Sequence, residues 1–163
     1  MEIEKNIQVS VVMGSQSDWE IMQVACDLLE KLDVSYEKKI VSAHRTPDRL
    51  YEYANSLTKR KVKVVIAGAG GAAHLPGMIA SKTDVPVIGV PINATDLKGL
   101  DSLYSIVQMP RGYPVATMAI GAPGAFNAAI FAIQVLAVSD IIISEKIKEW
   151  RFDTTNHVKD EPE

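Results

Sequence analysis

The amino-acid sequence predicts an α/β fold, a three-layer sandwich built on one parallel sheet in a single domain. Its 163 residues are enough for one domain with a proper hydrophobic core. Segments with strand character alternate with segments of helical periodicity along the chain. One strand segment, 62–67, is apolar apart from Lys63, which is typical of a parallel strand covered on both faces.

The first third of the chain predicts a strand, a helix and a second strand. Residues 8–13 are rich in valine, which favours a strand. In 18–32 the apolar residues recur at helical spacing, which predicts an amphipathic helix with Ile21, Met22, Ala25, Leu28, Leu29 and Leu32 on its inner face. Residues 34–41 carry β-branched side chains and predict the second strand.

The second helix is predicted over 49–59. Pro47 suits a first helical position, and Thr46 suits the cap before it. The buried strand at 62–67 follows, then a short helix at 75–81 and a fourth strand at 85–90. A helix at 102–107 and a fifth strand at 115–120 complete the alternation, which predicts right-handed crossovers in a sheet of the flavodoxin or Rossmann type.

The segment 124–138 is apolar on all sides instead of along one stripe. A helix of this kind must be buried all round, and small α/β domains place their helices outside the sheet. We therefore expect a homo-oligomer whose interface uses this helix. The alternative is that it is the central helix of a monomer.

Composition and charge exclude several classes of protein. The net charge of −3 argues against a nucleic-acid surface, which needs clustered Lys and Arg. The single cysteine, Cys26, cannot form an internal disulfide, falls in a helical pattern and is expected to be a core residue in a reducing cytoplasm. Residues 1–5 carry no signal-peptide pattern, and 125–138 is too short for a bilayer. We therefore expect no membrane partner.

The turn after the first strand, Met13-Gly14-Ser15-Gln16-Ser17-Asp18, has two interpretations. Its serine hydroxyls and helix-start amides would suit a phosphate, and Asp18 would suit a ribose diol. Plain helix capping by Ser or Asp explains the same residues, and this motif alone favours capping. It matches neither the dinucleotide fingerprint nor the P-loop.

The turn after the second strand, Ser42-Ala43-His44-Arg45-Thr46-Pro47, places a proton carrier beside an anion-binding side chain. An imidazole can give and take a proton in one cycle, and a guanidinium can hold a phosphate through parallel hydrogen bonds. His44 is expected at the carboxyl edge of the sheet, where open α/β folds bind ligands. A surface ion pair is the alternative for Arg45.

A third turn, Gly68 to Gly77, is expected to leave bare backbone amides near a planar ligand or a carboxylate. His74 in this turn would contact the ligand or cap the next helix, and the two interpretations are equally supported. In the loop 108–114, Arg111 would hold anion charge or tie subunits together. The chain has no metal-ligand spacing and no G-x-S-x-G elbow, which favours acid–base chemistry in a preformed pocket.

These motifs, together with Asp101 to Gly112, resemble the 5-(carboxyamino)imidazole ribonucleotide mutase family of purine biosynthesis, class I. The resemblance covers about Val9 to Trp150. Animal-type relatives that carboxylate aminoimidazole ribonucleotide directly have Ser-Ala-His-Lys-Gly-Pro at the second turn and lack His-Leu-Pro-Gly in the third. Arg45, Thr46 and His74 therefore place this chain on the mutase side. The departures are Gln16, where a lysine is frequent, and the segment 92–100.

The resemblance implies an isomerase that moves the substrate's carboxylate from the exocyclic nitrogen to ring carbon 4 by decarboxylation and recarboxylation. It implies no cofactor and no metal, His44 as general acid and base, and a cytoplasmic homo-octamer with pockets shared between subunits. It also implies a mutase domain over 1–152, ending in C-terminal oligomerisation helices, and a polar tail over 153–163. The implied substrate-binding residues are Ser15, Ser42 and Arg45 for the phosphate, Asp18 for the ribose, and Gly70, Gly71 and His74 for the carboxylate.

Two other functions stay open at this point. One is a non-catalytic module on a flavodoxin-like sheet that senses a ribonucleotide. It would bind the nucleotide tightly without consuming it and would be indifferent to His44→Asn. The other is direct carboxylation of aminoimidazole ribonucleotide, for which bicarbonate and that nucleotide would suffice.

Overall fold

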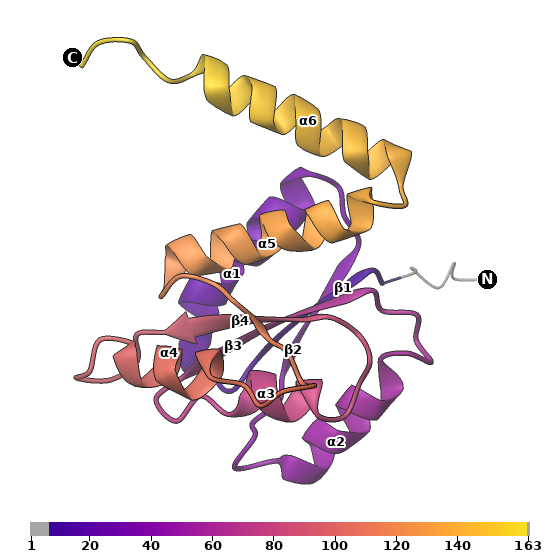
Figure 1. Ribbon diagram of the computed structural model, residues 1–163, viewed down its shortest axis with the longest axis vertical. Coiled ribbons are helices and arrows are strands. Elements are labelled where there is room, and N and C mark those ends of the chain that lie inside the picture. Colours follow the sequence, from indigo (N-terminus) through magenta and orange to yellow (C-terminus); the bar gives the residue numbers. More distant parts are fainter. Residues whose placement is uncertain (1–6, 163) are drawn as a thin grey trace.

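The computed structural model describes residues 7–162 and confirms the predicted three-layer α/β sandwich (Figure 1). Its five-stranded sheet is parallel at every pairing and has the strand order β2-β1-β3-β4-β5. This is the flavodoxin-type order, in which the chain reverses its direction of travel across the sheet between β1 and β3. The strands are β1 (Val9–Met13), β2 (Tyr36–Ile40), β3 (Val64–Gly70), β4 (Val87–Ile92) and β5 (Ala116–Thr117).

Helices cover both faces of the sheet (Figure 1). On one face α1 (Trp19–Lys31) and α5 (Ala122–Ala137) pack against β1, β3 and β4. The other face carries α2 (Pro47–Ser56), α3 (Leu75–Ala80) and α4 (Leu100–Val107). Each predicted helix is present, with ends that differ by a few residues. Cys26 is 1% exposed in the core, and burial raises the pKa of its thiol to about 11, so it stays protonated.

Two strand predictions were wrong in extent. The third strand continues through Gly70, so the turn expected from Gly68 begins after it. The chain reaches Gly70 as a strand because the ladder with β4 runs to the pair Gly70 and Ile92. The fifth strand, predicted over 115–120, pairs with β4 only through Ala116 and Thr117.

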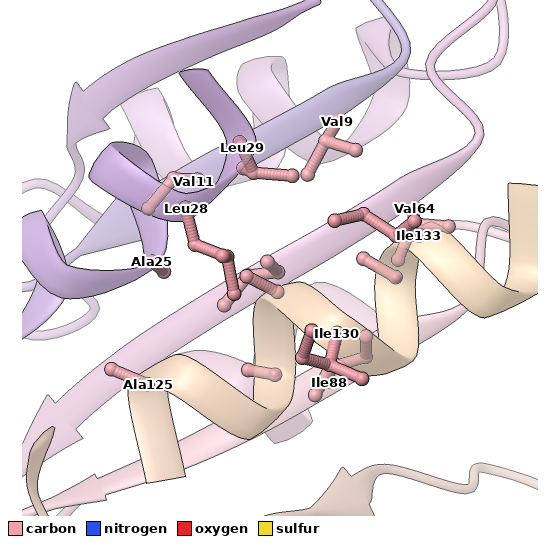
Figure 2. Packing of buried hydrophobic residues seen from close by; sticks show 14 of the residues in the cluster. Val9, Val11, Ala25, Leu28, Leu29, Val64, Ile88, Ala125, Ile130 and Ile133 are labelled. Atoms are coloured by element: carbon pink, nitrogen blue, oxygen red, sulfur yellow. The ribbon is translucent and has the colours of Figure 1, made fainter. Parts of the chain in front are cut away.

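The all-apolar helix α5 is covered mainly by its own chain. It lies over β3 and β4, between α1 and the C-terminal helix α6 (Ile141–Asn156). Figure 2 shows Ala125, Ile130 and Ile133 of α5 near Ile88, Val64 and Leu28. The premise that this helix needs a second subunit is therefore wrong for most of its surface, although Phe131 is 39% exposed.

Helix α6 continues to Asn156, four residues into the segment assigned to the polar tail. The resemblance implied C-terminal helices here without bounds, and only Ile143 and Ile147 of α6 are buried. Its first residues leave Ile141 and Ile142 exposed, and its second half is mostly exposed. No helix in the part of the chain that the structure describes is long and apolar enough to cross a membrane.

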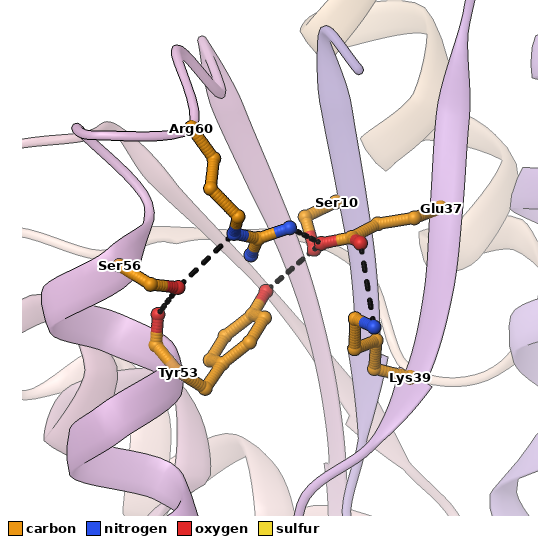
Figure 3. Close-up of polar contacts among 6 residues, drawn as sticks. All are labelled: Ser10, Glu37, Lys39, Tyr53, Ser56 and Arg60. Carbon is orange, nitrogen blue, oxygen red and sulfur yellow. Dashed lines mark hydrogen bonds and ion pairs between the residues drawn. The ribbon is translucent and has the colours of Figure 1, made fainter. Parts of the chain in front are cut away.

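A polar network joins α2 to the edge of the sheet (Figure 3). Arg60 donates to Glu37 of β2 at 2.7 Å and to Ser56 at 3.0 Å. Ser10 of β1 donates to Glu37 at 2.8 Å, and its oxygen lies 2.7 Å from the Tyr53 hydroxyl. Because the single hydrogen of Ser10 is used by the carboxylate, Tyr53 must donate to Ser10. The network fixes α2, and with it the loop that precedes this helix.

Candidate active site

A cavity of about 340 Å³ opens at the carboxyl edge of the sheet, where the strand order reverses between β1 and β3. Open α/β sheets bind their ligands at such a point, and the volume suits a small molecule. The walls come from the loops after β1, β2, β3 and β4. The lining residues are Gly14, Ser15, Ser17, Asp18, Ser42, Ala43, His44, Arg45, Ala69, Gly70, Ala72, His74, Leu75 and Ala94.

The loop after β1 is a helix cap that also faces the cavity. Ser15 Oγ accepts a hydrogen bond from the Ser17 amide at 3.1 Å, and Asp18 Oδ2 accepts one from the Ser15 amide at 3.0 Å. This reciprocal pair is a capping box at the start of a short 3-10 helix, Gln16–Asp18. The capping interpretation is confirmed, and Ser15 and Asp18 line the cavity as well.

Asp18 is 5% exposed at the bottom of this loop. Burial raises the pKa of its carboxyl above the ordinary value, although the amides of Ser15 and Gly14, the Ser17 hydroxyl and the charge of Arg45 all act in the opposite direction. A buried carboxyl with bonds from its own loop keeps little freedom, so Asp18 holds a fixed position in the wall of the cavity.

Arg45 connects the loops after β1 and β2. Its Nε donates to Ser42 Oγ at 3.2 Å, and a terminal nitrogen donates to the Gly14 carbonyl at 3.0 Å. The Arg45 amide also donates to Ser42 Oγ at 3.2 Å. No carboxylate among residues 7–162 forms an ion pair with Arg45, so the surface ion pair considered from the sequence is not formed. Its charge is available to an anion in the cavity.

The two histidines of the turns lie against each other. His44 Nε2 and His74 Nδ1 are 2.8 Å apart, and the rings meet edge to face at 82°. One nitrogen must donate and the other accept, so the contact couples the tautomers of the two rings. His74 occupies the position before α3, yet its side chain makes no capping hydrogen bond. Of the two interpretations from the sequence, the structure favours the one that places His74 in the site.

Of the two glycines predicted at the site, Gly70 and Gly71, only Gly70 lines the cavity. Gly70 lines the cavity and approaches the next loop closely: a Cβ on Gly70 would lie 2.7 Å from Ala94 Cβ. Gly71, at a φ of +65°, is outside the lining. Its amide donates to Ser102 Oγ at 2.9 Å, and its carbonyl accepts from Ser105. The backbone of Gly71 therefore anchors the turn to α4.

Sequence reasoning named no individual alanine of the wall. Ala94 follows β4 in the segment 92–100, which carried no motif, and Ala69 and Ala72 were seen only as small residues of the turn. An alanine gives no chemical signal, and only strand order could have placed Ala94 beside Gly70. Arg111 lies outside this cavity. No cluster of His, Cys, Asp and Glu suited to a metal occurs within residues 7–162.

The fold and the cavity define a class: an α/β protein whose cavity, at the switch point of its sheet and beside a pair of imidazoles, suits a small anionic molecule. The family model described as AIR carboxylase matches residues 8–157. The chain therefore belongs to the AIR carboxylase family, and the family predicted from the motifs is confirmed.

Curated relatives carry the name N5-carboxyaminoimidazole ribonucleotide mutase. The relative from Haemophilus influenzae is 55% identical over 161 residues, which is 99% of this chain and 98% of the relative. The relative from Bacillus subtilis is 57% identical over 150 residues, which is 92% of this chain and 93% of the relative. The crystal structure of Treponema denticola PurE has the same fold, with a TM-score of 0.83 at 24% identity over 91% of this chain and 92% of that one.

Proposed function

We propose that this protein is a mutase that moves the carboxylate of N5-carboxyaminoimidazole ribonucleotide from the exocyclic nitrogen to ring carbon 4, in purine (IMP) biosynthesis. The observation that carries the proposal is the imidazole pair, His44 and His74, in a cavity that also holds the unpaired charge of Arg45. Identity of 55% over 161 residues to a relative named for this activity supports the choice of substrate.

The reaction needs one proton given and one taken. The bond between the exocyclic nitrogen and the carboxyl carbon breaks, carbon dioxide leaves, and the nitrogen keeps the electron pair and takes a proton from His44. Ring carbon 4 then attacks the carbon dioxide, and His44 takes the proton that this carbon loses. The proton balance closes within one turnover, so a single imidazole serves as acid and then as base. His74 supports the role by hydrogen bonding to the His44 ring.

Carbon dioxide must stay in the cavity between the two steps. The apolar part of the lining, formed by Ala43, Ala69, Ala72, Leu75 and Ala94, offers it a wall without strong hydrogen-bond partners. Excluding water from such a wall also prevents loss of the intermediate. We place the migrating carboxylate beside these alanines, next to Gly70 and His74. Gly71 is left out of this assignment because Ser102 already binds its amide.

The remaining polar residues suit the ribose phosphate. Ser15, Ser42 and Arg45 offer two hydroxyls and a guanidinium from neighbouring loops, which fits a phosphate dianion. Asp18 accepts hydrogen bonds and would repel a phosphate, so we assign the ribose diol to its carboxylate.

The test is a turnover assay without ATP and with a metal chelator, following the ultraviolet band of the product. We expect conversion by the wild type and a loss of about 10²–10⁴-fold in kcat for His44→Asn, with nucleotide binding retained. His157→Asn is the matched control, because His157 is exposed near the end of α6. Tight binding with no turnover by the wild type would contradict the proposal and favour a nucleotide-sensing module.

Direct carboxylation is the second candidate, since the matched family model is described as AIR carboxylase. The assay is then run with aminoimidazole ribonucleotide and bicarbonate alone. Product formed at the rate seen with the carboxyamino substrate would favour the carboxylase.

We also propose a cytoplasmic homo-octamer. Exposed apolar side chains on and before α4, with Leu97 at 61%, Leu100 at 49% and Tyr104 at 69% exposure, support burial against further copies of the chain. Light scattering after size exclusion measures the mass, and a monomer at assay concentration would contradict this assembly.

A further inference from the structure

Thr46 occupies the cap position of α2 without capping it. The sequence predicts that its hydroxyl binds the first turn of the helix, yet no capping hydrogen bond is formed. The hydroxyl turns back toward the sheet instead. It accepts from the Ser42 amide at 3.0 Å and donates to the Ser42 carbonyl at 3.0 Å. With the Thr46 amide, which also donates to the Ser42 carbonyl at 3.0 Å, these bonds form a closed loop that we call the Ser42–Thr46 clip.

The Ser42–Thr46 clip encloses the two residues with chemical roles. His44 and Arg45 lie between its ends, and both line the cavity, whereas Thr46 does not. Arg45 has further attachments that do not involve Thr46, through Ser42 Oγ and the Gly14 carbonyl. Within residues 7–162, the His44 ring forms its hydrogen bond with His74. The position of His44 therefore depends more on the clip than that of Arg45 does.

We propose that Thr46 is a positioning residue for the reaction: its hydroxyl holds the backbone under His44 so that the ring meets His74. This inference rests on the proposed mutase function and assigns Thr46 a role through His44, not through contact with the substrate. A misplacement of about 1 Å at a reacting group can lower a rate by about 10²-fold. Loss of the two hydroxyl bonds that hold this loop would therefore be expected to lower kcat.

The test compares Thr46→Val with Thr46→Ser. Valine keeps the branched shape and removes both hydroxyl bonds, whereas serine keeps the hydroxyl. We expect Thr46→Val to lower kcat by about 10–100-fold with KM within about threefold, and Thr46→Ser to stay within about threefold of wild type in both. A structural role alone would lower the thermal midpoint without this split between kcat and KM.

Thr83→Val is the matched control. The Thr83 hydroxyl also accepts a backbone amide, that of Val85 at 3.2 Å, and Thr83 is outside the cavity lining. We expect kcat for Thr83→Val to equal that of the wild type. A kcat for Thr46→Val equal to wild type, or an equal loss in Thr83→Val, would overturn the proposal.

Crystal structures of wild type and Thr46→Val separate this proposal from the function on which it rests. We expect the 2.8 Å contact between His44 and His74 in the wild type and a longer, broken contact in Thr46→Val. If the wild type isomerises nothing, the proposed function fails, and the two structures still decide whether Thr46 positions the ring. An unchanged contact in Thr46→Val would refute the positioning role.

Discussion

Two arginines flank α2 in the sequence, Arg45 before it and Arg60 after it, and they have different roles. Arg60 forms an ion pair with Glu37 at 2.7 Å, and the carboxylate is also bound by Ser10 and faces Lys39 (Figure 3). Arg45 binds a hydroxyl and a backbone carbonyl, both neutral, and borders the cavity. The charge of Arg60 is neutralised within the fold, whereas the charge of Arg45 is held in place and left for a ligand.

The difference teaches how to separate structural from functional polar clusters in this molecule. Both clusters combine serines, a carboxylate and a guanidinium. In the network of Figure 3 each charged group faces an opposite charge, so burial is compensated. At the cavity the positive group has neutral anchors, and the nearby carboxyl of Asp18 is engaged by its own loop. The arginine at the cavity is thus the one whose hydrogen bonds go to neutral groups, which supports our proposal that an anion binds there.

Substituting each arginine by glutamine should give opposite results. Arg45→Gln removes charge-assisted bonds to a phosphate, and we expect KM to rise about 10–100-fold with little change in thermal midpoint. Arg60→Gln leaves Glu37 without its partner, at a cost of about 1–2 kcal/mol, since Arg60 is partly exposed. For a chain of this size that lowers the midpoint by roughly 2–8 °C.

Steady-state kinetics and calorimetry on the same two variants measure both effects. The comparison fails if Arg45→Gln unfolds as readily as Arg60→Gln, or if Arg60→Gln loses as much affinity as Arg45→Gln.

The carboxyls of the two clusters should respond to pH in opposite directions. Burial tends to raise the pKa of Glu37, but the bonds from Arg60 and Ser10 outweigh it and hold the pKa below the ordinary 4.5. Burial holds the pKa of Asp18 above the ordinary 3.8. At Glu37 the unfolded chain binds more protons, so the stability that Glu37 contributes is complete above about pH 4.5 and is lost as the pH falls. At Asp18 the folded chain binds more protons than the unfolded chain, so the stability that Asp18 contributes declines as the pH rises from about 4.

Urea unfolding between about pH 3 and pH 6 checks this sign. We expect the difference in unfolding free energy between wild type and Glu37→Gln to widen with rising pH. The difference between wild type and Asp18→Asn should shrink over the same range. Parallel slopes for the two variants would show that the clusters do not differ electrostatically.

An ion pair in open solvent gives the smallest effect. Lys148 and Glu145 of α6 are also 2.7 Å apart, but both side chains are 64% exposed. Water already solvates both charges, so Lys148→Gln should change the unfolding free energy by less than about 0.5 kcal/mol. Urea unfolding beside Arg60→Gln makes the comparison direct. If Lys148→Gln lost as much unfolding free energy as Arg60→Gln, burial would not determine how much each ion pair stabilises the fold.

The sequence alone determined the succession of strands and helices along the chain and the positions of the turns after the first two strands. Strand and helix periodicities are local, as are the preferences of Pro47 for a helix start and of Ser15 for a cap, so the residues themselves carry them. Ser15, Asp18, Ser42, His44, Arg45, Gly70 and His74 were all predicted at the site, and all line one cavity. The turn from Gly68 was misplaced because a ladder with β4, not local glycine content, decides where β3 ends.

Only the tertiary structure decided which of these groups touch. His44 and His74 are 30 residues apart, and their contact depends on β1 lying between β2 and β3 in the sheet. The same order brings Arg45 to the Gly14 carbonyl and Ala94 to Gly70. Helix packing also covers α5 with α1 and α6, a role that the all-apolar pattern alone had attributed to another subunit. Side-chain contacts between loops follow from strand order and register, and no local stretch of sequence encodes either of these.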